Sequence, residues 1–256
     1  MARFDLTDFE WSVIQPLLPN KPRGVPRVDD RRVLNGIFWR LRTGAPWADI
    51  PSRYGPHTAC VNRFNRWRKG GVWGRLLAAV SKAYDGDIQM IDSSSIRVHQ
   101  HGANAKKKDG GSDCIGRSRG GLTTKIPAVV DADGLPITLK LTTGQAHDGP
   151  VAHTMVGTVG HEQILLADRA YDSDALRHGL KERGAWANIK PKSNRKQAPV
   201  FCAYLYKQRN LVERFFNKIK NFRAVATRYD KLDANYLAGV KLASTRIWLR
   251  ANESVA

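Results

Sequence analysis

The sequence predicts an α/β protein, in which a mixed sheet flanked by helices follows an all-α domain of helix-turn-helix-like character. Two observations carry this prediction. Apolar residues recur at the helical period of about 3.6 residues as far as residue 85, and the pattern changes to the strand period of two from residue 87. Beyond that change, the expected order of elements is β-β-β-α-β-α-β-α. We therefore expect two domains, residues 1–85 and residues 86–256.

Glycine and proline divide the first domain into four expected helices. Thr7 is suited to cap the first helix, because a threonine side chain can accept a hydrogen bond from an unpaired backbone amide. The charge of Asp29 favours the start of the second helix, and Gly44 is a natural stop for it. Thr58 is suited to cap the third helix, which ends at Gly70. These signals predict a small helical domain.

The third expected helix is the candidate element for reading DNA. It is rich in bases around an apolar stripe, and with the helix before it and the Gly/Pro-containing turn it suggests a helix-turn-helix-like unit. A plain helical bundle with a solvated basic face would give the same pattern. The candidate DNA-binding residues of this helix are Asn62, Arg63 and Arg66.

The first strand of the second domain carries an acid on its largely apolar face. Along residues 87–100 the side chains alternate, and Asp92 shares a face with Met90 and Ser94. An inward carboxylate is costly unless it is paired or bound to a metal. Three serines, Ser93 to Ser95, follow the acid, but no GxSxG motif is present, so a serine nucleophile is not favoured.

The following elements alternate between loops, strands and helices. Residues 101–121 are glycine-rich, basic and without periodicity, which predicts a flexible basic loop. The stretch from Asp131 to Gly134 is a hairpin turn signal between two strands. A short apolar run at residues 163–167 predicts a buried strand that ends at Asp168. Asp172 and Asp174 are read as helix-capping residues.

Residues 206–220 predict a helix with an apolar stripe and a charged face. The stripe consists of Val212, Phe215, Phe216 and Ile219. The charged face carries one acid among aromatic and basic residues, and it consists of Tyr206, Arg209, Glu213 and Lys220. An ion pair between Arg209 and Glu213, which lie four residues apart, would be the ordinary explanation of the acid.

The chain is strongly basic. There are 42 Lys and Arg residues against 23 Asp and Glu residues, which gives a net charge of +19 and a pI near 10.2. A charge of this size indicates a polyanionic partner, and nucleic acid is favoured over a membrane surface. The three cysteines form no CxxC pair, which argues against a zinc ribbon. No run approaches the ~18 apolar residues of a membrane span, so we expect a cytoplasmic, nucleoid-associated bacterial protein.

Three acids have a common interpretation as metal ligands. Asp92 lies within a strand, Asp168 ends one, and Glu213 lies on the basic helix. Ligands of open sheets gather at the carboxyl ends of strands. Carboxylates converging there could hold two Mg²⁺ ions, with Mn²⁺ as a substitute, about 3.5 to 4 Å apart. Arg209 and Lys220 would then hold phosphates. Asp168 could instead cap a turn.

The motifs around these acids resemble those of the DDE transposases of bacterial insertion sequences, in the group named after insertion sequence five. IDSSSIRVH, with Asp92, resembles the first acidic motif, and LLADRAYDSDALR, with Asp168, resembles the second. The spacing Tyr-x2-Arg-x3-Glu-x6-Lys around the third acid is matched by Tyr206, Arg209, Glu213 and Lys220. Residues 116–148 and residues 4–19 also resemble corresponding stretches, so the resemblance spans nearly the whole chain.

The resemblance implies a fold, an activity and partners. The fold would be ribonuclease-H-like, and the activity would be Mg²⁺-dependent cleavage at the element ends with transfer of the freed 3′ hydroxyls into target DNA. Asp92, Asp168 and Glu213 would be the metal ligands, and residues 1–85 would recognise terminal inverted repeats in double-stranded DNA. Tyr206, Arg209 and Lys220 would position the terminal DNA. Bringing two ends together implies a homodimer or a larger assembly on DNA.

Two other functions use the same residues. A chain derived from a transposase could act only as a DNA-binding regulator. A metal-dependent nuclease could hydrolyse DNA without strand transfer, because water can replace the attacking hydroxyl at the same acids.

Overall fold

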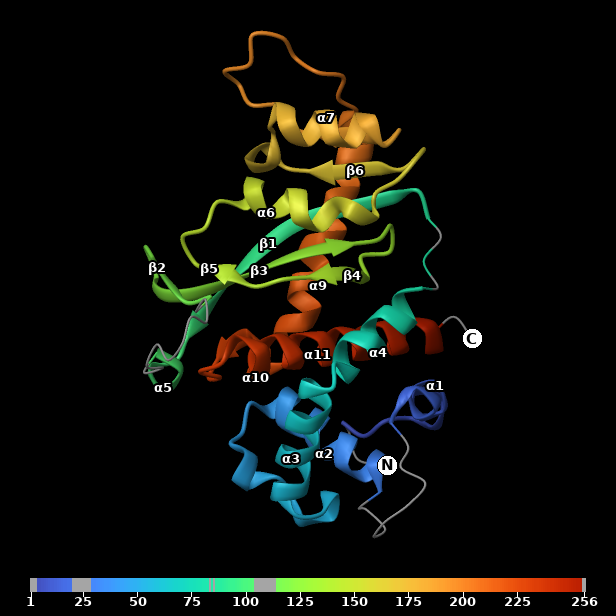
Figure 1. Ribbon diagram of the computed structural model, residues 1–256, viewed down its shortest axis with the longest axis vertical. Helices are drawn as coiled ribbons and strands as arrows, with labels where there is room; N and C mark the ends of the chain where they lie inside the picture. Colours follow the sequence, from blue (N-terminus) through green and yellow to red (C-terminus); the bar gives the residue numbers. More distant parts are fainter. Residues whose placement is uncertain (1–3, 20–28, 83, 85, 104–113, 255–256) are drawn as a thin grey trace. The chain divides into compact units, whose positions relative to one another are not determined.

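A computed structural model describes residues 4–19, 29–82, 84, 86–103 and 114–254 (Figure 1). The chain forms two compact units. A helical unit comprises Met1–Val80, Val98–Gly111 and Lys218–Ala256, and a sheet unit comprises Ser81–Arg97 and Ser112–Asn217. The carboxyl-terminal segment therefore groups with the amino-terminal helices, which differs from a single boundary after residue 85. No helix in the described part of the chain is long and apolar enough to cross a membrane.

The sheet unit is built on one long strand, β1, Ile88–Val98. The sheet order is β2-β3-β1-β6-β7, and β4 and β5 also pair with β3. β1 is antiparallel to β3 and parallel to β6, and β6 is parallel to β7, so the predicted mixed sheet is confirmed. The other strands of the sheet unit are β2 (Gly116–Ser118), β3 (Gly121–Val130), β4 (Pro136–Leu139), β5 (Thr142–Thr143), β6 (Ile164–Ala167) and β7 (Trp186–Ile189), and a short strand, β8 (Thr227–Arg228), belongs to the helical unit.

Part of the predicted loop at residues 101–121 is regular structure. The helix α5 occupies Gln100–Ala103, and β2 pairs antiparallel with the start of β3. Thr124 Oγ1 donates to the carbonyl of Cys114 at 2.6 Å, which holds the chain just before β2. The prediction of a loop was therefore wrong at both ends of the segment, and residues 104–113 lie outside the described residues.

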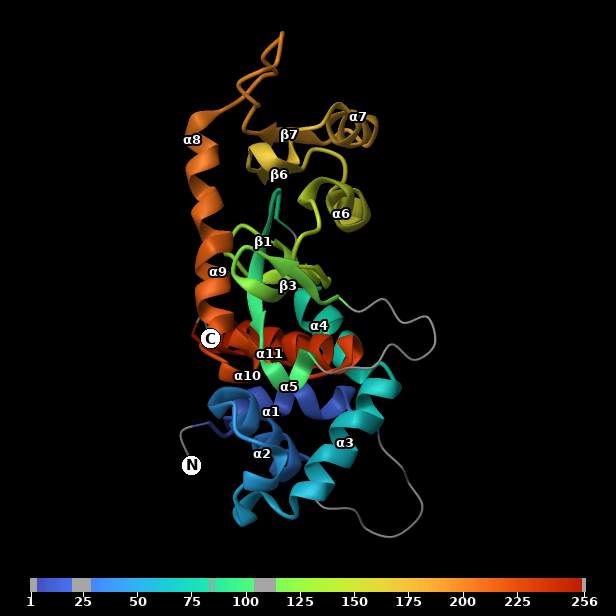
Figure 2. The same cartoon turned by 90° about the vertical axis from the view of Figure 1, so that its left-hand side faces the viewer.

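Helices cover both faces of the sheet (Figure 2). α6 (Asp148–Met155) and α7 (Asp174–Glu182) lie on one face. α8 (Ala203–Tyr206) and α9 (Asn210–Lys220), joined by a 3₁₀ turn at Lys207–Arg209, form a nearly continuous rod on the other face. The predicted apolar stripe of α9 is buried, as expected for a helix that packs on a sheet.

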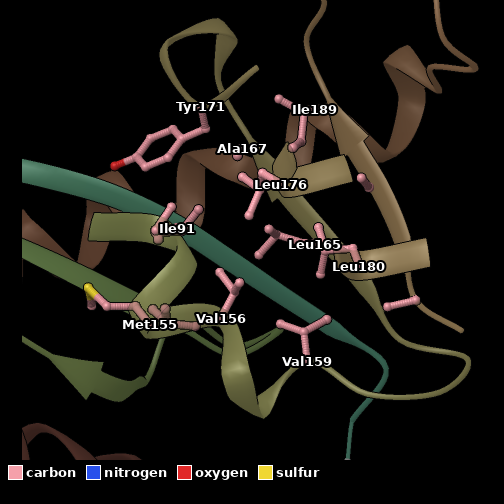
Figure 3. Close-up of a cluster of buried hydrophobic side chains, with 14 residues drawn as sticks. Ile91, Met155, Val156, Val159, Leu165, Ala167, Tyr171, Leu176, Leu180 and Ile189 are labelled. Carbon is pink, nitrogen blue, oxygen red and sulfur yellow. The ribbon is translucent and has the colours of Figure 1, made fainter. Parts of the chain in front are cut away.

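An apolar cluster fills the space between the sheet and the helices α6 and α7 (Figure 3). Ile91 of β1 and Leu165 of β6 contribute to it from the sheet. Leu176 and Leu180, which lie four residues apart on α7 and so share one face of that helix, contribute from the helix side. These side chains are at most 1% exposed. Burying each one contributes about 1.5 to 3 kcal/mol, so this cluster fixes β1 against β6.

The hairpin turn at residues 131–134 confirms its prediction and also contacts α9. The Asp131 carboxylate accepts hydrogen bonds from the amides of Asp133 and Leu135, at 2.9 and 2.8 Å. Gly134 has a φ of 74°, and a Cβ there would lie 2.9 Å from the carbonyl oxygen of Leu211 on α9. The turn therefore requires glycine both for its backbone and for its close approach to the helix.

The helical unit contains α1 to α3, most of α4, and the carboxyl-terminal helices. Thr7 forms a capping box with Glu10, and Gly44 ends α2 with a φ of 74°, as predicted. α3 begins at His57 after Pro56, so Thr58 is not its cap. The helix bounds are α1 (Asp8–Ile14), α2 (Asp30–Thr43), α3 (His57–Lys69), α4 (Val72–Ser81), α10 (Arg223–Ala226) and α11 (Asp233–Glu253).

A buried ion pair joins the two ends of the chain within the helical unit. Glu10 on α1 is fully buried and accepts a hydrogen bond of 2.5 Å from Arg246 Nε on α11. The same guanidinium donates to the backbone carbonyls of Phe4 and Asp5, at 3.1 and 2.6 Å. These bonds explain why α11 groups with α1, since a buried carboxylate needs a partner.

Candidate active site

Two of the predicted metal ligands lie just beyond the paired segment of two adjacent parallel strands: Asp168 directly follows the carboxyl end of β6, and Asp92 lies within the longer strand β1. Met90 of β1 is paired with Leu166 of β6, and each candidate acid, Asp92 or Asp168, lies two residues further along its own strand direction. Parallel pairing therefore brings the two acids to the same edge of the sheet, where ligands of open sheets bind. The negative charge of Asp168 contributes to the raised pKa of Asp92, which reflects this proximity.

Asp92 is held by one amide and one guanidinium. Its Oδ1 accepts a hydrogen bond of 2.8 Å from the amide of Ser93, and its Oδ2 accepts one of 2.7 Å from Arg209 Nη1. Burial raises the pKa of Asp92, and these two donors only partly offset that effect. The site therefore holds a partly buried carboxylate that takes up a proton more readily than an ordinary Asp.

Arg209 connects Asp92 to the third predicted acid, Glu213. Its Nη2 donates to Glu213 Oε1 at 2.5 Å, so the expected pair at four residues' spacing is present. The same guanidinium, however, also binds Asp92, 117 residues away in the sequence. The side chain of Glu213 is 51% exposed and that of Asp92 is 22% exposed, so solvent reaches both carboxylates.

Asp168 caps a short turn, as the alternative interpretation of the sequence stated. It precedes a 3₁₀ turn, Arg169–Tyr171, and its Oδ1 accepts a hydrogen bond of 2.8 Å from the amide of Ala170. Its second carboxylate oxygen has no hydrogen bond or ion pair within the described residues. Capping therefore leaves one oxygen of Asp168 available for another ligand.

The carboxylates of these acids are suitable ligands for a divalent metal, but their side chains are not grouped around a common metal position in this structure. Carboxylate oxygens are the ligands that Mg²⁺ and Mn²⁺ prefer. In the described ranges no three acidic, His or Cys side chains are grouped so that they could hold a metal ion. The guanidinium of Arg209, bound to both Asp92 and Glu213, lies where a cation shared by them would lie. These residues fit a metal if Arg209 exchanges its carboxylate partners for another anion.

A buried hydroxyl supports a polar ligand at this edge of the sheet. Tyr171 is 2% exposed, and its Oη lies near the Ser93 hydroxyl but forms no hydrogen bond of good geometry among the residues that the structure describes. Burial raises its pKa first, followed by the charges of Asp148, Asp92 and Asp168. Figure 3 shows its hydroxyl directed away from the labelled aliphatic side chains. A hydroxyl with unused bonding capacity among acids is suited to bind a water molecule or a cation's ligand shell.

Of the two other residues predicted on the charged face of this helix, Tyr206 lies beside Arg209, whereas Lys220 lies near the end of α9. The Tyr206 ring centroid lies 5.8 Å from Arg209 Cζ and 5.8 Å from Lys190 Nζ. Lys190 was not among the predicted site residues, and its place beside Tyr206 adds an exposed cation to the partly buried Arg209. Lys220 is exposed near the end of α9, in the segment that groups with the helical unit.

The candidate recognition helix α3 exposes only some of its predicted DNA-binding residues. Asn62 and Arg66 are exposed. Arg63 is buried, forms an ion pair with Asp30 of α2, and lies over the Trp67 ring at 5.2 Å. The prediction that Arg63 is available to DNA was therefore wrong in this structure, because α2 supplies its partner. The α2–α3 connection, residues 44–56, is also longer than the roughly three- to four-residue turn of a helix-turn-helix.

Asp172 was read from the sequence as a helix cap, and it has a different role. Its buried carboxylate accepts hydrogen bonds from Arg177 Nε at 2.8 Å, from Arg195 Nε at 2.6 Å and from the Lys192 amide at 2.8 Å. Ser173 caps α7 instead. Burial alone would raise the pKa of Asp172, but these donors outweigh it and lower the pKa to about 2.

A family match covers the sheet unit and part of the helical unit. Residues 83–246 match the family described as "Transposase DDE domain". The chain belongs to the DDE transposase family. A DDE transposase domain implies polynucleotidyl transferase activity and the use of divalent metal ions. Residues 6–77 of the transposase match a second family, described as "Putative transposase of IS4/5 family".

Individual relatives agree with the family match. A Brucella ovis protein described as "Putative transposase for insertion sequence element IS6501" is 41% identical over 130 residues, which are 50% of this transposase and 100% of the relative. A Burkholderia cepacia protein, "Insertion element IS402 uncharacterized 16.2 kDa protein", is 36% identical over 141 residues, which are 50% of this chain and 93% of the relative.

A solved transposase structure is similar to this chain in fold. It is the piggyBac transposase synaptic complex with hairpin DNA, which is 12% identical with a TM-score of 0.53 over 96% of this transposase and 72% of that chain. At this identity the likeness concerns the fold alone. The predicted ribonuclease-H-like fold, with an all-helical region before it, is confirmed.

Proposed function

We propose that this transposase cleaves DNA at the ends of an insertion sequence and joins the freed 3′ hydroxyls to target DNA. The single observation that carries the proposal is the parallel pairing of β1 and β6. It brings Asp92 and Asp168 to one edge of the sheet, and Arg209 ties Glu213 to Asp92. A hydroxyl or water molecule bound at this edge could attack a phosphodiester in line.

The three acids would hold the divalent metal, with Mg²⁺ as the expected ion and Mn²⁺ as its substitute. Two bound ions would stabilise the charge on the attacking and leaving oxygens of the phosphodiester. The protein's own part would be to hold Asp92 on β1 close to Asp168, directly after β6, and to bring Glu213 from α9. Strands hold such groups more rigidly than loops do.

Arg209 would change partners when DNA binds. A guanidinium binds phosphate and carboxylate with the same paired hydrogen bonds, so a DNA phosphate can replace the carboxylates. Tyr206, which lies beside both Arg209 and Lys190, would pack against the terminal nucleotides, and exposed Lys220 would hold a further phosphate. This exchange would free Asp92 and Glu213 at the moment when the substrate arrives.

The helical unit would recognise the terminal inverted repeats in double-stranded DNA. Asn62 and Arg66 are the exposed candidates on α3, and Arg63 supports the helix from inside. The net charge of +19 favours DNA affinity that falls steeply with salt. Because two ends must be joined to one target, we expect a dimer or a larger assembly on DNA, working on the bacterial nucleoid.

The test compares excision and integration by the wild type with Asp92→Asn, Asp168→Asn and Glu213→Gln. Each variant should lose at least about 1000-fold in cleavage, since metal ligands supply several kcal/mol of charge stabilisation. Glu182→Gln, on the exposed face of α7, is the matched control and should keep wild-type activity. The readouts are nicking of inverted-repeat DNA and joining of the cut ends to a second duplex.

Each outcome separates the alternatives. Binding of the wild type without metal-dependent nicking would leave a DNA-binding regulator. Nicking without joining would leave a nuclease. Full cleavage by any one of the three acid variants would remove that residue from the catalytic set.

A further inference from the structure

A hydrogen-bonded chain leads from Asp92 through the sheet to a fourth acid, Asp148. The amide of Ser93 donates to Asp92 Oδ1 at 2.8 Å, while Ser93 Oγ donates to Asp148 Oδ1, also at 2.8 Å. Asp148 is the first residue of α6 and lies 55 residues from Ser93 in the sequence. One serine therefore links the carboxylate at the candidate site to a helix on the other side of the strand.

Asp148 is fixed in place by a lysine. Lys125 Nζ lies 3.3 Å from both carboxylate oxygens of Asp148 and donates to the carbonyl of Ala146 at 2.8 Å. The Lys125 and Asp148 side chains are 18% and 21% exposed, so water screens this pair less than a surface pair. Lys125 comes from β3, where its neighbour across the strand pair is Ser95 of β1. The network therefore joins β1, β3 and α6.

The hydroxyl of Tyr171, which follows Asp168 in the chain, lies near the carboxylates of Asp92 and Asp148. Tyr171 is the last residue of the 3₁₀ turn that Asp168 caps, and the charges of Asp148, Asp92 and Asp168 all act on its hydroxyl. The acids of β1 and β6 thus share one buried polar region behind them.

We propose that Asp148 is a positioning residue that orients the Asp92 carboxylate through Ser93. A serine amide can hold a carboxylate oxygen only if the serine itself is fixed, and Asp148 fixes it from the opposite face. Residues that hold a metal ligand from behind affect metal affinity or activity about 10- to 100-fold when they are changed. The inference rests on the proposed role of Asp92, and it assigns Asp148 no contact with DNA.

An acid in the first turn of a helix also stabilises that helix, which is the simpler role for Asp148. The two roles differ in what Ser93→Ala does. That change leaves Asp148 at the start of α6 and paired with Lys125, and removes the interactions of the serine hydroxyl with Asp148 and with Tyr171. A helix-stabilising role predicts no effect of Ser93→Ala on metal binding or on catalysis.

The experiment uses the full chain and compares Ser93→Ala, Asp148→Ala, their double variant and Ser93→Thr. The matched control is Ser95→Ala, an exposed serine two residues along the same strand. The first readout is the Mn²⁺ concentration that gives half of the metal-induced rise in melting temperature. The second is kcat and KM for nicking a duplex that carries the inverted repeat.

We expect Ser93→Ala and Asp148→Ala each to need about 10-fold more Mn²⁺ and to lower kcat about 10- to 100-fold. KM for DNA should stay within about 2-fold, since the network makes no DNA contact. The double variant should be no worse than the poorer single variant, because both changes break one chain. Ser93→Thr keeps the hydroxyl and should stay close to the wild type.

Three results would overturn the proposal: wild-type Mn²⁺ dependence and kcat in Ser93→Ala, additive losses in the double variant, or a loss confined to KM. If Asp148→Ala fails to fold, Ser93→Ala decides alone. A wild type that shows the Mn²⁺ shift without cleaving DNA would overturn the proposed function, while the Mn²⁺ readout would still test the network.

Discussion

Two arginine–carboxylate clusters lie in the same sheet unit, and they differ in how completely the acid is satisfied. Asp172 has a side chain that is 0% exposed, and two guanidinium groups and a backbone amide bind both of its oxygens. Asp92 is 22% exposed and is bound by one amide and one guanidinium that it shares with Glu213. We call the Asp172 cluster closed, because every oxygen of its carboxylate is bound within the protein, and the Asp92 cluster open, because its carboxylate can exchange its partner for a ligand.

The difference appears in the two pKa values, which shift in opposite directions. Burial raises the pKa of Asp92 because its donors only partly offset the lost hydration. The donors around Asp172 overcome the same effect and lower its pKa to about 2. A buried carboxylate with a full set of hydrogen-bond donors stabilises the folded state. A buried carboxylate whose donors do not offset the loss of hydration is typical of a functional site. The comparison separates a structural acid, Asp172, from a candidate functional acid, Asp92, within one sheet unit.

The largest expected effect is on stability at the closed cluster. Asp172→Asn should lower the free energy of unfolding by about 3 kcal/mol, because it leaves Arg177 without its carboxylate partner and Arg195 with only the exposed Asp174. Asp92→Asn should change it by less than about 1 kcal/mol, since that pair is partly exposed. Urea unfolding of both variants measures the difference. Equal losses in the two variants would remove the distinction between the clusters.

A smaller effect is expected in the dependence of stability on pH. The pKa of Asp172 is lowered in the folded state, so its contribution is present above the ordinary value of 3.8 and is lost as the pH falls towards about 2. The shift corresponds to roughly 2 kcal/mol. The pKa of Asp92 is raised, so the folded state loses stability as the pH rises through the range above 3.8.

The measurement is the unfolding free energy of the wild type minus that of Asp172→Asn or Asp92→Asn, between pH 2 and pH 6. The first difference should shrink as the pH is lowered, and the second should shrink as the pH is raised. Curves that move in the same direction would contradict the assigned signs.

The smallest expected effect on stability comes from Arg209, the shared partner in the open cluster. Arg209→Gln should change the free energy of unfolding by less than about 1 kcal/mol, and it should strengthen Mn²⁺ binding in the absence of DNA, because a competing cation is removed. DNA affinity should fall at the same time. Titration calorimetry with Mn²⁺ measures the first effect, with Arg214→Gln, an exposed arginine of α9, as control. Weaker Mn²⁺ binding by Arg209→Gln would show that the guanidinium does not compete with the metal.

The elements of the fold could be predicted where the signal is local. The alternation along β1, the apolar stripe of α9 and the Asp131–Gly134 turn depend on neighbours in sequence, and the structure contains all three. The adjacency of Asp92 and Asp168 could also be predicted, because it follows from parallel strands. A resemblance to known motifs then supplied the ribonuclease-H-like fold.

The pairing of side chains across the fold could not be predicted. Arg209 meets Asp92 from 117 residues away, Asp148 meets Ser93 from 55, and Arg195 meets Asp172 from 23. Periodicity predicts on which face of its own helix or strand a residue lies, but it does not predict which side chain of another element will contact that face. Arg63 illustrates this limit, since helical spacing could not reveal that Asp30 of the preceding helix binds it.

The bond between Glu10 and Arg246 has a consequence for synthesis of the chain. A ribosome makes α1 long before α11, so the buried carboxylate of Glu10 receives its arginine only after residue 246 has been translated. The helical unit, which is the expected reader of the inverted repeats, is thus completed only by a helix that lies 236 residues further along the chain. Premature termination or a frameshift within the gene would therefore leave a chain with an unpaired buried acid rather than a free DNA-binding fragment.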